Sequence, residues 1–185
     1  TVGERLCELY SSWIQGLEQI IERGDEVQPD LVPAARRHVQ NAMKCLGRMV
    51  DGVSLLRERP DVRRAFSLMN RAMLMQQIHY RISSESPRAW EARGRDLVLK
   101  EPYTPPEYSG KPNRWRPFQF AFILMNIRSI VDPSSDEREI VDVIWVPTGG
   151  GKTEAYLGLA AFTILFRRIS DPSSAGTVVL TRYTL

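Results

Sequence analysis

The sequence predicts an α/β protein in which an α-helical region precedes a parallel β-sheet with crossover helices. Three observations predict this fold. Apolar residues recur every three to four positions through residues 1–82, which is the period of one helix face. Two short runs rich in β-branched residues, 140–146 and 177–181, flank a helical segment at 152–169. A strand, a helix and a second strand in this order imply a parallel pair joined by a right-handed crossover.

Three amphipathic helices are expected in the N-terminal region. The first is a periodic apolar stretch that ends at Gly24. The second begins near Pro33, which the first turn of a helix accepts, and Pro60 interrupts it. The third begins at Asp61, whose carboxylate favours a helix N-terminus, and continues to about residue 82. We therefore expect residues 1–82 to form a helical accessory domain.

Residues 83–113 are predicted to be a proline-rich linker. Proline and glycine are too dense there for a regular element: Pro87, Gly94, Pro102, Pro105, Pro106, Gly110 and Pro112. A structureless connection of this length is unusual inside one compact domain. The linker is therefore expected to separate the helical domain from a second domain at 114–185. That domain would begin with a buried helix at 118–130, and a short strand or packing segment is expected at 97–99.

The most specific motif is Pro147-Thr148-Gly149-Gly150-Gly151-Lys152-Thr153, between the first predicted strand and the helix that follows it. Glycines let successive backbone N–H groups turn inward around anionic oxygens, and a helix N-terminus behind them favours phosphates. Lys152 would contact the β- and γ-phosphates, and the Thr153 hydroxyl would ligate Mg²⁺. The sequence thus predicts an ATP and Mg²⁺ site with these two residues in the catalytic roles. The alternative is a flexible glycine turn followed by a chance lysine and threonine.

The run Pro147–Glu154 resembles motif I of superfamily 2 helicases. Upstream, Arg116-Pro117-Phe118-Gln119 resembles the arginine-x-aromatic-glutamine element of many such enzymes, in which the glutamine amide reads the adenine edge of ATP. Downstream, Leu180–Leu185 lies where motif Ia follows the second strand, and the family uses a threonine or arginine there against the nucleic-acid backbone. The general phosphate-loop pattern has glycine where this chain has Val146.

This resemblance implies a partial RecA-like motor lobe over 114–185, truncated after motif Ia. ATP and Mg²⁺ would be the cofactors, and the nucleotide-binding residues would be Arg116, Gln119, Pro147, Thr148, Gly149, Gly150, Gly151, Lys152, Thr153 and Glu154. DNA contacts would come from Thr181, Arg182 and Tyr183. More narrowly, 115–119, 145–159 and 182–185 are similar to the helicase component of DISARM-type bacterial anti-phage systems. The implied activity is an ATP-driven DNA helicase or translocase, with DNA and other defence-system proteins as partners.

The Asp-Glu pair of motif II is expected beyond Leu185, because we interpret the sequence as a fragment of a longer protein. The fragment alone is therefore expected to bind nucleotide weakly and not to hydrolyse it. The alternative function for the parent protein is a phosphate-loop ATPase that acts as a switch or signalling module without moving along DNA.

Several of these residues also have ordinary structural explanations. Gln119 and Arg116 could be surface residues, and Glu154 could be a first-turn carboxylate that favours the helix dipole. Thr181 and Tyr183 are also ordinary residues for the end of a strand.

Composition excludes several other classes of protein. A net charge of +3, from 25 basic and 22 acidic residues, gives no strong global field, so nucleic-acid binding would have to be local. Two cysteines and two histidines show no zinc-site spacing. No apolar run approaches the about 20 residues that span a bilayer, so we expect a cytoplasmic protein without a membrane partner. The sequence gives no oligomeric state.

Overall fold

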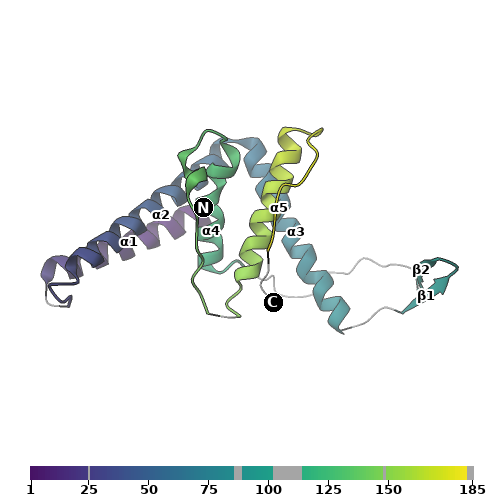
Figure 1. The fold of residues 1–185 in the computed structure, drawn as a ribbon, viewed down its shortest axis with the longest axis horizontal. Coiled ribbons are helices and arrows are strands. Elements are labelled where there is room, and N and C mark those ends of the chain that lie inside the picture. The colour runs from purple at the N-terminus through teal and green to yellow at the C-terminus, as the bar shows by residue number, and fades with distance from the viewer. Residues whose placement is uncertain (25, 86–88, 102–113, 148, 183–185) are drawn as a thin grey trace.

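The computed structural model describes residues 1–24, 26–85, 89–101, 114–147 and 149–182. In these residues the chain forms five α-helices, one 3-10 helix and one β-hairpin (Figure 1). The helices are α1 (Val2–Arg23), α2 (Val32–Glu58), α3 (Pro60–Glu85), α4 (Pro117–Val131) and α5 (Lys152–Ser170), with the 3-10 helix η1 (Asp136–Glu139). The hairpin pairs β1 (Trp90–Arg93) with β2 (Asp96–Leu99) in antiparallel register.

The helix boundaries follow from local residue chemistry. The Thr1 hydroxyl accepts a hydrogen bond from the Glu4 backbone N–H at 3.3 Å and caps α1. Gly24 ends α1 in the left-handed conformation, with φ of 72°. Pro33 lies in the first turn of α2, and Pro60 begins α3. The predicted helices at the N-terminus, at 118–130 and at 152–169 are therefore confirmed.

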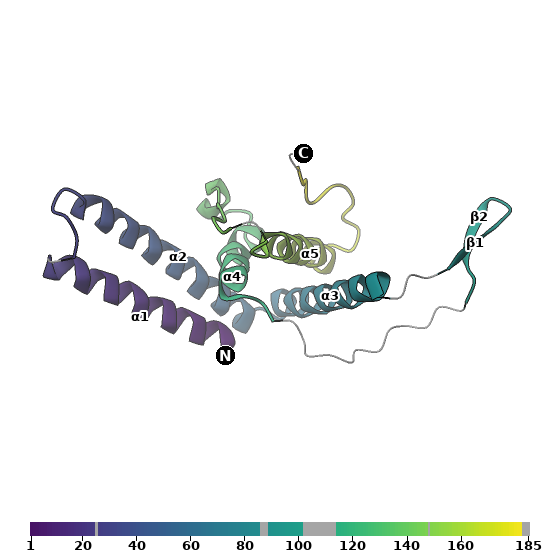
Figure 2. The same ribbon diagram turned by 90° about the horizontal axis from the view of Figure 1, so that it is seen from below.

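Helix α4 lies at the centre of the molecule. Helices α1 and α2 form an antiparallel pair that extends to one side, and the β-hairpin lies beyond the opposite end of α3 (Figure 2). Helix α4 packs against α2 on one side and α5 on the other, while α5 also packs against α3. The helices before the predicted linker are thus in direct contact with those after it.

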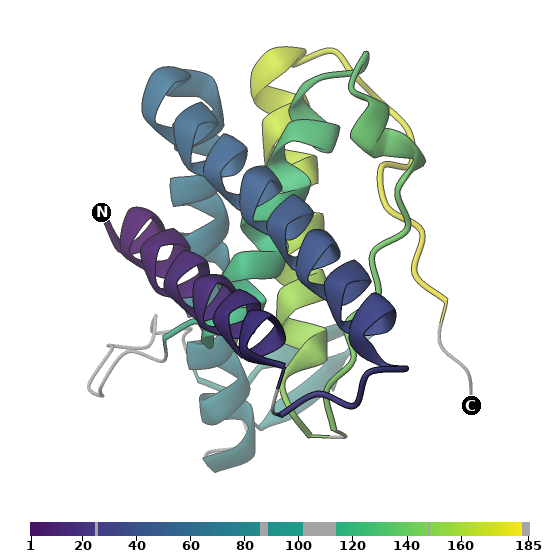
Figure 3. The ribbon, with the colours of Figure 1, turned by 90° about the vertical axis from the view of Figure 1, so that its left-hand side faces the viewer.

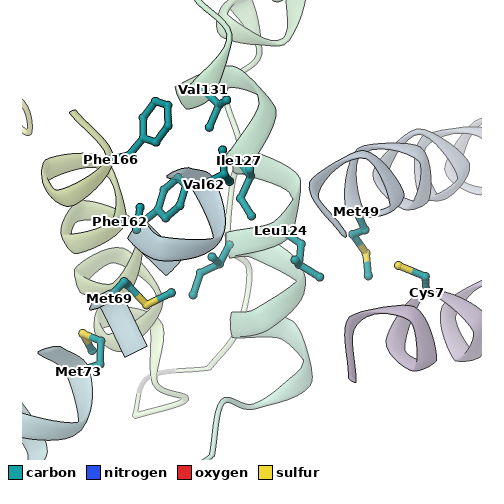
Figure 4. Close-up of a cluster of buried hydrophobic side chains, with 12 residues drawn as sticks. Cys7, Met49, Val62, Met69, Met73, Leu124, Ile127, Val131, Phe162 and Phe166 are labelled. Atoms are coloured by element: carbon teal, nitrogen blue, oxygen red, sulfur yellow. The ribbon is translucent and has the colours of Figure 1, made fainter. Parts of the chain in front are cut away.

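The main core surrounds the buried face of α4 (Figure 4). Ile123, Leu124 and Ile127 of this helix are fully buried. They belong to one cluster with buried side chains from the other four α-helices: Cys7, Met49, Val62, Ala65, Met69, Met73, Phe162 and Phe166. Residues from both predicted domains therefore share one apolar cluster. The predicted separation of the chain into two domains joined by a linker at 83–113 stays a prediction.

The predicted parallel sheet is wrong, and with it the RecA-like lobe. In the described part of the chain, residues 140–146 and 177–181 form no strand, and the sheet present is the two-stranded antiparallel hairpin (Figure 3). The reason lies in α5, which buries Ala155, Phe162 and Phe166 on a side that packs against α3 and α4. In a parallel sheet with crossover helices, the apolar side of such a helix packs against the sheet. In α5 this side packs against two helices instead.

The segment 140–146 has side chains of alternating exposure, as a strand does, but it has no strand partner within the described ranges. Val141, Val143 and Trp145 are 88%, 78% and 94% exposed, whereas the residues between them are half-buried. The alternating exposure of a strand is therefore present without the pairing, since pairing depends on a neighbour elsewhere in the chain.

Two further observations concern the cysteines and the membrane. Cys7 and Cys45 are free thiols, and burial raises the pKa of both. Among the helices that the structure describes, none has the length and apolar character that crossing a bilayer requires.

Candidate functional site

The glycine-rich motif forms a loop that leads directly into α5. Gly149 and Gly151 have φ angles of 77° and 88°, in the left-handed region that favours glycine. Gly151 is also crowded, because a Cβ at this position would lie 2.6 Å from Nε2 of Gln119. Lys152 is the first residue of α5. Thr148 lies outside the described residues, so its predicted role stays a prediction.

The start of α4 holds this loop from one side. The Arg116 guanidinium donates a hydrogen bond from Nη1 to the Gly150 carbonyl at 2.8 Å. The Gln119 amide donates from Nε2 to the Gly151 carbonyl at 2.7 Å, and its oxygen accepts from the Arg116 backbone N–H at 2.8 Å. Gln119 is only 5% exposed. The structure therefore brings both upstream residues to the loop, and the surface alternative for Gln119 does not hold.

These two carbonyl contacts orient the backbone N–H groups of the loop. In a trans peptide the C=O and N–H point in opposite directions. Because the carbonyls of Gly150 and Gly151 face α4, the N–H groups of Gly151 and Lys152 point away from it. No side chain of the described residues caps α5, so its N-terminal N–H groups and partial positive charge stay available to an anion. The arrangement fits a phosphate group.

The Lys152 ammonium is held beside the loop. Its Nζ donates to the carbonyl oxygens of Val146 at 2.7 Å and Pro147 at 3.1 Å. An incoming phosphate oxygen could replace either carbonyl and would form a charge-assisted hydrogen bond. Thr153 is exposed, and in the described part of the chain its hydroxyl has no hydrogen-bond partner. That hydroxyl could therefore ligate a metal ion.

Glu154 lies in the first turn of α5, where a carboxylate favours the helix dipole. Its Oε2 atom is buried and has no hydrogen-bond partner among the residues that the structure describes. A Cβ on Gly151 would lie 3.3 Å from this oxygen, so the carboxylate borders the loop. The structure thus places Glu154 with the nucleotide-binding residues that the resemblance implies.

An open cleft of about 1000 Å³ lies beside the loop. One wall is α3, another is the start of α4, and Gly149, Gly151 and Glu154 line the end at the loop. Sequence reasoning assigned α3 to an accessory region and did not predict this contribution. A periodic pattern shows which residues share a helix face, but it does not show what that face meets.

Sequence reasoning also missed the ion pair that fixes the chain before the loop. Arg48 of α2 donates from Nη1 and Nη2 to the two carboxylate oxygens of Asp142 at 2.6 and 2.7 Å. Its Nε donates to Glu137 at 3.4 Å. The hydrogen bonds to Asp142 are the main reason that the pKa of the Arg48 guanidinium is raised. Arg48 thereby connects an N-terminal helix to the extended segment that precedes the loop.

The predicted DNA-contacting residues lie apart from these interactions. Thr181 and Arg182 are exposed in irregular chain after α5, and Tyr183 lies outside the described residues. In the part that the structure describes, no hydrogen bond or ion pair joins Thr181 or Arg182 to the loop. Their contact with DNA stays a prediction.

Comparison with known proteins finds a relative that aligns with nearly the full length of the chain. The chain is 36% identical over 188 residues to the DISARM protein DrmA of Bacillus paralicheniformis, and the match covers 97% of the chain. The chain is therefore similar to a segment of a DISARM protein. It spans 15% of the length of that relative. No protein-family model matches the chain.

The extent of this match adds to the motif resemblance. The motifs lie in the last seventy or so residues, whereas coverage of 97% also takes in the N-terminal helices. The relation to a DISARM protein therefore includes the helices that surround the loop.

Proposed function

We propose that the chain forms the ATP-binding part of an ATP-driven DNA helicase or translocase that acts in bacterial anti-phage defence. The observation that carries the proposal is the glycine-rich loop at the N-terminus of α5, held by Arg116 and Gln119 with the Lys152 ammonium beside it. The similarity to a DISARM protein supports the defence role and suggests other defence-system proteins as partners.

The chemistry assigned to the loop is binding and charge stabilisation. The N–H groups of Gly151 and Lys152 and the N-terminus of α5 would receive the phosphate oxygens. Lys152 would move its ammonium from the carbonyl oxygens to the β- and γ-phosphates, where charge develops during phosphoryl transfer. Thr153 would supply a hydroxyl ligand to Mg²⁺, which neutralises phosphate charge when bound.

The residues upstream of the loop would act as positioning residues. Arg116 and Gln119 hold two consecutive carbonyls, which keeps the N–H groups aimed at the phosphates. The carbonyl oxygen and one N–H of the Gln119 amide are already used in these contacts. Its reading of the adenine edge stays a prediction. Thr181, Arg182 and Tyr183 remain the residues proposed to contact DNA.

Stimulation of ATP hydrolysis by DNA tests this function in the full-length protein that carries the chain. We expect single- or double-stranded DNA to raise the hydrolysis rate several-fold, because a translocase couples hydrolysis to movement along its track. A polyanion without bases is the matched control and should leave the rate unchanged. Hydrolysis that is equally fast with and without DNA would reject the translocase and favour a phosphate-loop ATPase that acts as a switch.

A further inference from the structure

We propose that the cleft between α3 and the start of α4 holds the base of the bound nucleotide and that Gln77 of α3 reads the edge of that base. The inference rests on the proposed function, because it takes the phosphates to be bound at the loop. It goes further by assigning base recognition to a helix in which the sequence shows no chemical motif.

The cleft has the size and position for this role. Its volume of about 1000 Å³ is at the upper end of small-ligand pockets. Gly149 and Gly151 line it, so a nucleotide whose phosphates lie on the loop has the cleft open beside it. The base and ribose can therefore extend along the face of α3.

Trp115 gives the cleft a fixed aromatic wall. Its indole Nε1 donates to Oδ1 of Asn70 at 2.7 Å, and the Asn70 amide donates to the Phe66 carbonyl at 2.9 Å. The indole also packs against Gly158, where a Cβ would lie 2.7 Å from its Cη2. Trp115 is only partly buried and lines the cleft. A held aromatic ring of this kind is a stacking surface for a nucleobase.

Gln77 lies farther along the same face of α3. Phe66, Asn70, Leu74 and Gln77 follow one another at helical spacings of four, four and three, and all line the cleft. Of the side-chain amides that line the described part of the cleft, those of Asn70 and Gln119 are already hydrogen-bonded, whereas that of Gln77 is not.

An amide offers one acceptor and two donors, which can pair with the exocyclic amine and N7 of adenine. Guanine presents an acceptor oxygen where adenine has its amine, so the same pairing would not form with GTP. Gln77 is therefore assigned the selection of adenine over guanine.

The test compares two neighbouring glutamines of α3. Gln77 lines the cleft, whereas Gln76 is exposed and does not. In the full-length protein, calorimetry would measure the affinity of each variant for Mg-ATP, Mg-GTP and Mg-tripolyphosphate, which has no base. Gln77→Ala should weaken ATP binding about fivefold to tenfold and reduce the preference for ATP over GTP. It should leave tripolyphosphate binding unchanged, and Gln76→Ala should match the wild type with all three ligands.

The experiment distinguishes failure of the base assignment from failure of the proposed ATP site. ATP affinity and ATP preference that are unchanged in Gln77→Ala would overturn the base assignment while leaving the proposed ATP site intact. An equal loss of tripolyphosphate binding would also overturn it, since the effect would then not concern the base. A wild-type protein that binds neither ATP nor tripolyphosphate would overturn this inference together with the proposed function.

Discussion

Arg48→Ala is expected to lower the free energy of unfolding by about 3 to 5 kcal/mol. The substitution removes both hydrogen bonds to Asp142 and the weaker one to Glu137. The side chains of Arg48 and Asp142 are only 10% and 18% exposed, so the remaining carboxylate would be left largely desolvated without its counter-ion. The segment before the glycine-rich loop would also lose its attachment to α2.

Urea denaturation followed by circular dichroism would measure this loss. Arg128→Ala is the matched control, because Arg128 joins α4 to Asp51 of α2 in a far more exposed pair and should cost less than about 1 kcal/mol. The double variant Arg48→Met with Asp142→Leu should recover most of the stability, since it removes both charges of the main pair. A loss no larger than that of Arg128→Ala would contradict the assigned role of the buried pair.

Gly52→Ala is expected to destabilise the protein by about 3 kcal/mol. A Cβ at Gly52 would lie 2.2 Å from the carbonyl oxygen of Leu124 and 2.9 Å from its carbonyl carbon. Both are backbone atoms of the central helix α4, so no side-chain rotation can relieve the overlap. Helices α2 and α4 would have to separate, which would loosen the contact of Met49 with the core.

Gly47→Ala on the same helix is the control for this substitution. Apart from its chain neighbours and the backbone of α2, a Cβ at Gly47 would have no atom of the described residues within 4 Å. Only helix propensity therefore changes, and a gain of up to about 1 kcal/mol is expected. Thermal unfolding of both variants would compare the two effects. Equal shifts of the melting temperature in the two variants would show that α2 and α4 do not approach as closely as the structure indicates.

The helices were predictable because their signals are local. The periodic apolar residues, Gly24 after α1 and Pro60 before α3 all act within a few residues of the boundary that they determine. The parallel sheet was not predictable from 140–146 and 177–181, since a strand exists only when a distant segment supplies its hydrogen bonds. Helix α5 packs against α3 and α4, and no local pattern in α5 indicates that its apolar side contacts helices and not a sheet.

The candidate site likewise combines features that local sequence predicts with contacts between distant residues that it does not predict. The loop has a local signature, and the resemblance pointed to Arg116 and Gln119, which the structure brings to the loop. Their contact with a nucleotide stays a prediction. The interaction of Arg48 with Asp142 joins residues 94 positions apart, and that of Trp115 with Asn70 joins residues 45 apart. Neither residue type nor spacing predicts such pairs, so the N-terminal helices became part of the site only in the folded chain.

Equilibrium binding of Mg-ATP to the full-length protein, compared between the wild type and Lys152→Ala, tests the central claim most directly. Lys152 is half-exposed, and in the described part of the chain its ammonium bonds only to the backbone carbonyls of Val146 and Pro147, so the variant should keep the wild-type circular dichroism spectrum. We predict saturable binding by the wild type and roughly 100-fold lower affinity in the variant, because a charge-assisted contact with the phosphates is lost. Equal affinity in the two proteins, or no saturable binding by the wild type, would contradict a nucleotide site at this loop.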